Sequence, residues 1–90
     1  MAIGVLFQGG NVNQERYQQV LDQVAPGNQP APGMLYHAAG MGESGMVVFE
    51  VWESQEAAKR FFDEKLGQAL QEANITIQPT FFEIVNTMQP

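Results

Sequence analysis

One segment, Gly33 to Ser54, constrains the fold of this chain more than any other. Its sequence is GMLYHAAGMGESGMVVFEVWES. Two apolar runs flank a glycine-rich centre, and the second run is rich in the β-branched and aromatic residues that strands favour. The pattern predicts a β-hairpin with strands Met34 to Ala39 and Met46 to Trp52, joined by Gly40 to Gly45.

A helix is expected to follow this hairpin directly. Ser54 is a good N-cap, because its hydroxyl can accept hydrogen bonds from the free amides of a first helical turn. Glu56 places a negative charge in that turn, where the helix dipole favours one. Apolar residues then recur at helical spacing and predict one long helix: Ala58, Phe61, Phe62, Leu66, Ala69, Leu70 and Ala73.

The N-terminal part of the chain predicts a strand followed by a helix. Ala2 to Gln8 is a short apolar run that ends at Gly9-Gly10, which is typical of a strand and a turn. Asn11 or Asn13 can cap the helix that follows. The buried face of that helix is expected to hold the apolar residues at helical spacing: Tyr17, Val20, Leu21 and Val24.

The remaining segments complete a recognisable order of elements. Pro26 to Gly33 predicts a loop, Thr80 to Val85 a last strand, and 86–90 a frayed tail. The order is therefore β-α-β-β-α-β, the ferredoxin-like α+β pattern, with a four-stranded antiparallel sheet and two helices on one face. Ninety residues suit a single domain, 1–90.

The second face of this sheet is expected to be covered. A sheet with water on one side alternates apolar and polar residues, but both alternating sets of the strand 46–52 are largely apolar. Two-fold dimers are the commonest homo-oligomers, so a second copy of the chain is the expected cover. We expect two protomers to pair sheet to sheet, as a dimeric α/β barrel, with Val48 or another residue of a central strand facing the partner.

Composition excludes several function classes. The net charge is −6, with four cations and ten acids, so binding to nucleic acid or to an anionic membrane surface is not expected. The chain has no cysteine, which excludes disulfides, thiolate catalysis and zinc–thiolate sites. One histidine and dispersed carboxylates predict no metal site, and no phosphate-loop motif or other cofactor signature is present. Without a signal peptide or membrane span, a cytoplasmic location is expected.

Three residues of the predicted hairpin are candidates for chemistry. His37 is the only histidine and is either a general base or a packed residue with one hydrogen-bond partner. Glu50 stands between apolar neighbours and is either a functional acid or an anchor bonded to Tyr36, Tyr17 or a backbone amide. Trp52 either borders a ligand cleft or belongs to the core or the dimer interface.

The register of the hairpin decides whether these residues meet. If the hairpin is symmetric about Gly42-Glu43, His37 lies opposite Val48 and shares a face with Glu50 and Trp52. A slip of one residue would put His37 on the other face.

The hairpin and its helix resemble a known family. Leu35-Tyr36-His37, the glycine-rich turn, Val47 to Ser54 and the Phe-rich helix after Glu56-Ala57 are similar to the antibiotic-biosynthesis-monooxygenase-like branch of the dimeric α/β-barrel superfamily. The similarity follows the element order of nearly the whole chain and is most specific from Tyr36 to Leu66. It implies two ferredoxin-like protomers packed sheet against sheet. The superfamily includes cofactor-independent oxygenases of aromatic polyketides, haem-degrading monooxygenases and quinol oxygenases.

Individual positions match this branch only in part. Glu50 and Trp52 match its strand-end acid and aromatic residue. Oxygenase members often carry a histidine on the second helix, where this chain has Phe61 and Phe62. Haem-degrading members place an asparagine in the first strand, and Ala2 to Gln8 contains none.

Two functions follow as hypotheses. The first is a dimeric barrel protein that binds a small apolar or aromatic ligand between sheet and helices, with Trp52, Tyr36 and Phe61 as ligand-binding residues. The second is a cofactor-independent monooxygenase or isomerase of an aromatic substrate. In that enzyme His37 or Glu50 is the base, and Trp52 positions the ring.

Overall fold

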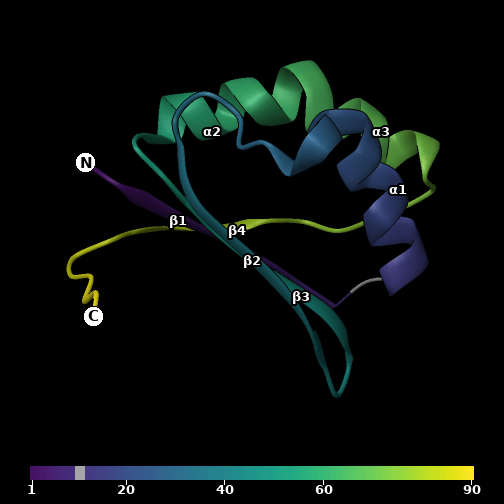
Figure 1. Cartoon of the computed structure of the whole chain (residues 1–90), viewed down its shortest axis with the longest axis horizontal. Coiled ribbons are helices and arrows are strands. Elements are labelled where there is room, and N and C mark those ends of the chain that lie inside the picture. Colours follow the sequence, from purple (N-terminus) through teal and green to yellow (C-terminus); the bar gives the residue numbers. More distant parts are fainter. Residues whose placement is uncertain (10–11) are drawn as a thin grey trace.

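The computed structural model describes residues 1–9 and 12–90, and its elements run in the predicted order (Figure 1). One sheet contains four antiparallel strands in the order β2-β3-β1-β4. Their bounds are β1 (Ile3–Gln8), β2 (Met34–Gly42), β3 (Gly45–Trp52) and β4 (Thr80–Glu83). The helices lie together on one face of this sheet (Figure 1), which confirms the predicted ferredoxin-like α+β fold. Among the residues described, none of the helices has the length and apolar character that a membrane crossing requires.

The first helix, α1 (Gln14–Val24), begins where an asparagine caps it. The side-chain Oδ1 of Asn13 accepts a hydrogen bond from the backbone amide of Arg16 at 2.8 Å. The alternative cap Asn11 and Gly10 of the predicted turn lie outside the described residues. A short 3-10 turn, η1 (Pro26–Asn28), follows α1 inside the segment predicted as a loop.

The predicted second helix is continuous but contains a wide turn. It consists of α2 (Gln55–Phe61), the π-helical η2 (Phe62–Leu66) and α3 (Gly67–Glu72), and the hydroxyl of Ser54 caps its start. At the end of the π turn, the Gly67 amide donates to the carbonyl of Phe62. A Cβ at Gly67 would lie 3.0 Å from that carbonyl oxygen, so the glycine suits the close approach. Leu66 belongs to the core cluster, and Phe61, five residues earlier across this turn, packs against it.

The hairpin turn is tighter than predicted. Its strands extend until Gly42 pairs with Gly45, and only Glu43-Ser44 lies between them. Gly45 takes a φ of +124°, which L side chains rarely adopt. His37 consequently pairs with Glu50 and not with Val48. Because the error is two residues along β3, the predicted shared face of His37 and Glu50 is correct although the predicted partner is wrong.

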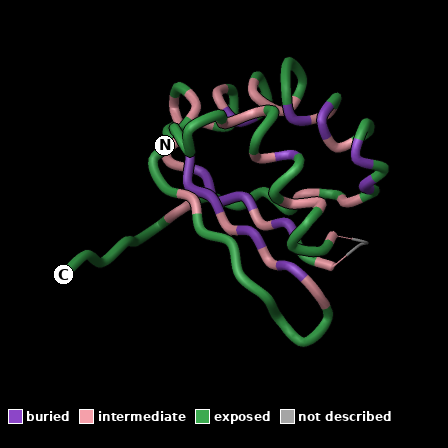
Figure 2. The backbone as a smooth tube through the Cα atoms, turned by 45° about the vertical axis from the view of Figure 1, so that its right-hand side comes forward, coloured by how far each residue is buried: buried purple, intermediate pink, exposed green. Residues whose placement is uncertain are grey.

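The core lies between the sheet and the helices. Purple segments in Figure 2 mark the buried parts of the backbone. Alternate residues of the two central strands are buried in the core: Ile3, Val5 and Phe7 from β1, and Met46, Val48, Glu50 and Trp52 from β3. Val48 therefore faces the helices, and the prediction that it faces a partner chain is wrong. Its neighbour Phe49 points to the opposite face, because successive strand residues alternate.

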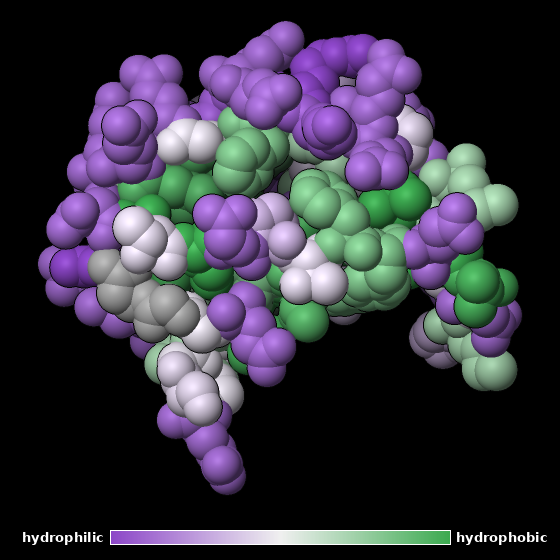
Figure 3. All heavy atoms as spheres, turned by 180° about the vertical axis from the view of Figure 1, so that it is seen from behind, coloured by the Kyte–Doolittle hydropathy of each residue, from purple (hydrophilic) through white to green (hydrophobic). Residues whose placement is uncertain are grey.

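The outer face of the sheet is apolar, as expected. The Phe49 ring stacks on that of Phe82 at 6.1 Å between centroids and contacts Tyr36 at 6.3 Å. Tyr36 and Phe82 are 55% and 41% exposed. Hydrophobic side chains also reach the surface below the helical layer in the rear view of Figure 3. Exposed apolar side chains gathered on one face are typical of an interface.

Candidate functional site

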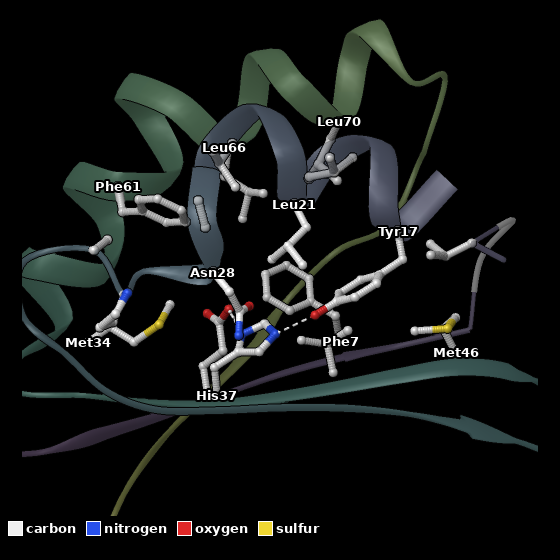
Figure 4. A pocket seen from close by; sticks show the side chains of 18 of the residues that line it. Phe7, Tyr17, Leu21, Asn28, Met34, His37, Met46, Phe61, Leu66 and Leu70 are labelled. Atoms are coloured by element: carbon white, nitrogen blue, oxygen red, sulfur yellow. Dashed lines mark hydrogen bonds and ion pairs between the residues drawn. The ribbon is translucent and has the colours of Figure 1, made fainter. Parts of the chain in front are cut away.

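Four side chains from three elements form a continuous chain of hydrogen bonds under the helices. Figure 4 shows the part of it where Tyr17 meets His37. The hydroxyl of Tyr17 lies 2.7 Å from Nε2 of His37, and Nδ1 of His37 lies 2.8 Å from Oε2 of Glu50. The indole Nε1 of Trp52 donates to Oε1 of Glu50 at 3.0 Å. The three residues singled out from the sequence thus meet, and Tyr17 joins them.

Strand geometry explains why these groups converge. His37 and Glu50 are directly opposite on the antiparallel strands β2 and β3. Glu50 and Trp52 are two residues apart on β3 and share its inner face. Tyr17 belongs to the sheet-facing stripe of α1, and its ring stacks near His37 with 6.1 Å between centroids. Glu50 is therefore bonded to His37 and Trp52, and within residues 1–9 and 12–90 its side chain bonds to none of the expected alternatives Tyr36, Tyr17 or a backbone amide.

The carboxylate of Glu50 determines the protonation pattern of its neighbours. Glu50 is 5% exposed and is the buried charged residue of the described chain. An ionised carboxylate only accepts hydrogen bonds, and each of its oxygens here meets an N–H donor. The proton of a neutral His37 is thereby held on Nδ1, and its Nε2 accepts from the hydroxyl of Tyr17. Two such bonds offset the cost of burying the charge.

Tyr17 stays a neutral phenol at higher pH than usual. Burial raises the pKa of the Tyr17 hydroxyl above its ordinary value of 10.0, and the negative charge of Glu50 raises it further. A raised pKa in the folded state gives stability that is present below the ordinary value and is lost as the pH rises through and above it. We therefore expect wild-type protein to lose stability above about pH 10 more steeply than Tyr17→Phe. Urea titrations across this pH range measure the difference, and parallel pH profiles would contradict it.

A cavity of about 350 Å³ adjoins these groups and lies between α1, the second helix and the sheet (Figure 4). Its volume is at the lower end of the range of small-molecule sites, about 300–1,000 Å³. Most of its lining is apolar, from residues such as Phe7, Leu21, Met46, Leu66 and Leu70. The polar lining comes from Tyr17, His37, Glu50, Asn28 and Gln29, and no lysine or arginine is among the described residues that line it.

The three predicted ligand-binding residues have different positions. Phe61 lines the cavity. Trp52 does not line this cavity; it is 1% exposed and packs against Phe61 with 5.3 Å between ring centroids. Of the two alternatives for Trp52, its position in this structure fits the core residue, with the indole bonded to Glu50. Tyr36 borders the cavity, but its ring packs on Phe49 at the opposite sheet face, so its phenol is directed away.

The sequence did not indicate the contact of Tyr17 with His37 or the place of Asn28 at the site. Tyr17 was expected on the buried stripe of its helix and as one possible partner of Glu50, and only the packing of α1 on β2 brings its hydroxyl to His37. Asn28 stands in a segment read as a plain loop, with φ of +60°, and lines the cavity. Asparagine tolerates this left-handed conformation better than most residues, which is the one local signal it carries. Within residues 1–9 and 12–90, no three His, Asp or Glu side chains gather as metal ligands would.

Comparison with known proteins gives structural relatives only. A scan against protein-family models finds no matching family, and a search of the curated proteins finds no significant match. Solved structures do match. One from Chloroflexus aurantiacus, named among the antibiotic biosynthesis monooxygenases, superposes with a TM-score of 0.70 at 16% identity and covers 99% of this chain and 98% of that chain.

Two further structures carry more specific names. SnoaB from Streptomyces nogalater, a cofactor-independent oxygenase, has a TM-score of 0.66 at 15% identity, over 99% of this chain and 97% of that chain. A monooxygenase from the ActVA-Orf6 gene of Streptomyces coelicolor, in complex with nanaomycin D, has a TM-score of 0.62 at 17% identity. The match covers 99% of this chain and 91% of that chain. Identities this low establish the fold and leave function open. The chain has the ferredoxin-like fold of the antibiotic biosynthesis monooxygenase proteins, as its hairpin and second helix predicted.

Proposed function

We propose that this protein binds a small aromatic molecule in the cavity and oxidises it with dioxygen, as a cofactor-independent oxygenase. The observation that supports this most is the His37–Glu50 pair at the wall of an apolar cavity of about 350 Å³. His37 is the base in this proposal. Glu50 is a positioning residue that fixes the imidazole tautomer and stabilises the imidazolium that forms.

The proposed chemistry balances without an external reductant. A proton from an activated position of a substrate such as anthrone moves to the base His37. The resulting carbanion transfers an electron to dioxygen. The two radicals combine to a peroxide, and loss of water leaves a new carbonyl group. One oxygen atom enters the product and the other leaves as water. An apolar cavity suits this sequence because it limits water around the carbanion.

The structural relatives support the same kind of reaction. One is named as a cofactor-independent oxygenase, and another is a monooxygenase crystallised with nanaomycin D. A second candidate function is ligand binding without turnover. Two observations favour it: Nε2 of His37 is already occupied by Tyr17, and Phe61 stands where oxygenase relatives were expected to carry a helix histidine.

We also propose that two copies pair through the outer sheet face. The apolar surface around Phe49 and Phe82 supports this arrangement, and small size adds to the gain from pairing. Light scattering should give about twice the 9.9 kDa chain mass. Phe49→Asp should give the single-chain mass, because an unpaired charge would be buried in the interface. Gln71→Asp, on the exposed side of α3, is the matched control and should stay dimeric. A monomeric wild type would contradict the proposal.

Ligand binding in the cavity has its own test. Anaerobic calorimetric titration with anthrone prevents oxidation and measures affinity alone. Leu21 points into the cavity (Figure 4), so Leu21→Trp should fill it and weaken binding by about tenfold or more. Val85→Trp adds the same side chain at a position that is 92% exposed and should bind as wild type does. Unchanged affinity in Leu21→Trp would place the ligand elsewhere.

A further inference from the structure

The hydrogen-bond chain has a direction. Glu50 accepts from the Nδ1–H of a neutral His37 and from the Nε1–H of Trp52. The one lone pair of Nε2 is then occupied by the Tyr17 hydroxyl at 2.7 Å. His37 consequently has no acceptor left for a ligand, although it lines the cavity.

Tyr17 is the end of this chain that can still meet a ligand. It lines the cavity, and its hydroxyl oxygen faces Nε2 of His37 (Figure 4). In the tautomer that Glu50 favours, the only hydroxyl proton of Tyr17 is donated to that nitrogen. Its oxygen can therefore accept a hydrogen bond from a ligand but cannot donate one without breaking the bond to Nε2. A carbonyl or ether oxygen of a ligand would find no donor at this end of the cavity.

Charge adds a second restriction. The described lining contains no lysine or arginine, and its charged member is the acid Glu50. The whole chain carries a net charge of −6. A carboxylate or phosphate ligand would lose its hydration in the cavity without gaining a cation, which is strongly unfavourable.

We propose that the cavity selects a neutral phenol or enol that donates its hydroxyl to Tyr17, and that Tyr17 is the catalytic residue that relays the proton to His37. This inference rests on the proposed function and names its substrate class. The ligand proton moves to the Tyr17 oxygen as the Tyr17 proton moves to Nε2. The products are a ligand anion, a restored phenol and an imidazolium paired with the Glu50 carboxylate. For anthrone, the reacting form is its enol tautomer.

Matched ligands test the direction of the chain. Binding of β-naphthol, its methyl ether and naphthalene carboxylate is measured by calorimetry at neutral to mildly alkaline pH. β-Naphthol should bind about fivefold or more tightly than the ether, the worth of one hydrogen bond. The carboxylate should bind most weakly. Equal binding of the naphthol and the ether would overturn the inference, as would preferred binding of the carboxylate or failure of both neutral compounds to bind.

A tyrosine variant and a control test the residue. Tyr17→Phe should reduce the preference for naphthol over the ether to less than about twofold. Ser44→Ala removes a hydroxyl in the exposed hairpin turn, away from the cavity lining, and should keep the full preference. A preference retained in Tyr17→Phe would assign the contact to another group. The comparison of naphthol with its ether on wild-type protein tests the direction of the hydrogen-bond chain even where a variant folds poorly. Oxygen uptake with anthrone is a separate readout. Uptake without naphthol preference would overturn only this inference. Preference without uptake would overturn the oxygenase proposal and the catalytic role of Tyr17, and it would leave the ligand class standing.

Discussion

Trp52→Ala is expected to lower the free energy of unfolding by about 3–5 kcal/mol. The indole is the most deeply buried large side chain of the described residues, at 1% exposure. Its removal leaves a cavity beside Phe61 and removes one of the two donors to the buried Glu50 carboxylate. The loss is a large fraction of the stability of a domain of this size. Urea unfolding followed by circular dichroism measures it, since the variant has no tryptophan to report by fluorescence.

Trp52→Phe separates packing from hydrogen bonding. The phenyl ring keeps most of the aromatic contact but leaves Oε1 of Glu50 without its donor. We expect an intermediate loss of about 1–3 kcal/mol. A loss below about 1 kcal/mol in Trp52→Ala would show that the indole is not the centre of the core.

Loss of the base is expected to have the largest effect on activity. His37→Ala and Glu50→Gln should each slow anthrone oxidation by about 10²-fold or more, the usual contribution of a general base. Glu50→Gln replaces the acceptor with an amide, so the imidazole loses both its fixed tautomer and its counter-charge. Glu43→Gln makes the same chemical change in the exposed hairpin turn and should leave the rate unchanged.

Binding and rate are compared in the same proteins. Unchanged anaerobic affinity in Glu50→Gln, with slower turnover, would assign the carboxylate to the chemical step. Turnover at the wild-type rate in both His37→Ala and Glu50→Gln would remove both residues from the mechanism.

The fold could be predicted from the sequence because its signals are local. The apolar runs of the strands, the caps Asn13 and Ser54, and the apolar stripes of both helices each specify their own element. The hairpin register was missed by two residues because the glycine-rich stretch before Gly45 permits several turns. The left-handed φ of Gly45 selects one of them.

The site was predicted only where one sheet contains it. His37, Glu50 and Trp52 share a face through strand periodicity, which the sequence displays. Glu50 and Trp52 are two residues apart on one strand, so their side chains lie on the same face, where the indole can donate to the carboxylate. Tyr17 comes from a helix, and its contact with His37 depends on how α1 packs over the sheet. The periodicity of the sequence does not predict the distance between the Tyr17 hydroxyl and Nε2 of His37.

Oxidation of anthrone under isotopically labelled dioxygen tests the proposed function most directly. Wild-type protein should consume anthrone and dioxygen in equal amounts, well above the buffer rate, and mass spectrometry should find one labelled oxygen atom in the new carbonyl of the product. His37→Ala should give the same product at a rate near that of buffer. Anthrone oxidation by wild type at the buffer rate, or a product whose new carbonyl carries no label, would contradict the oxygenase proposal.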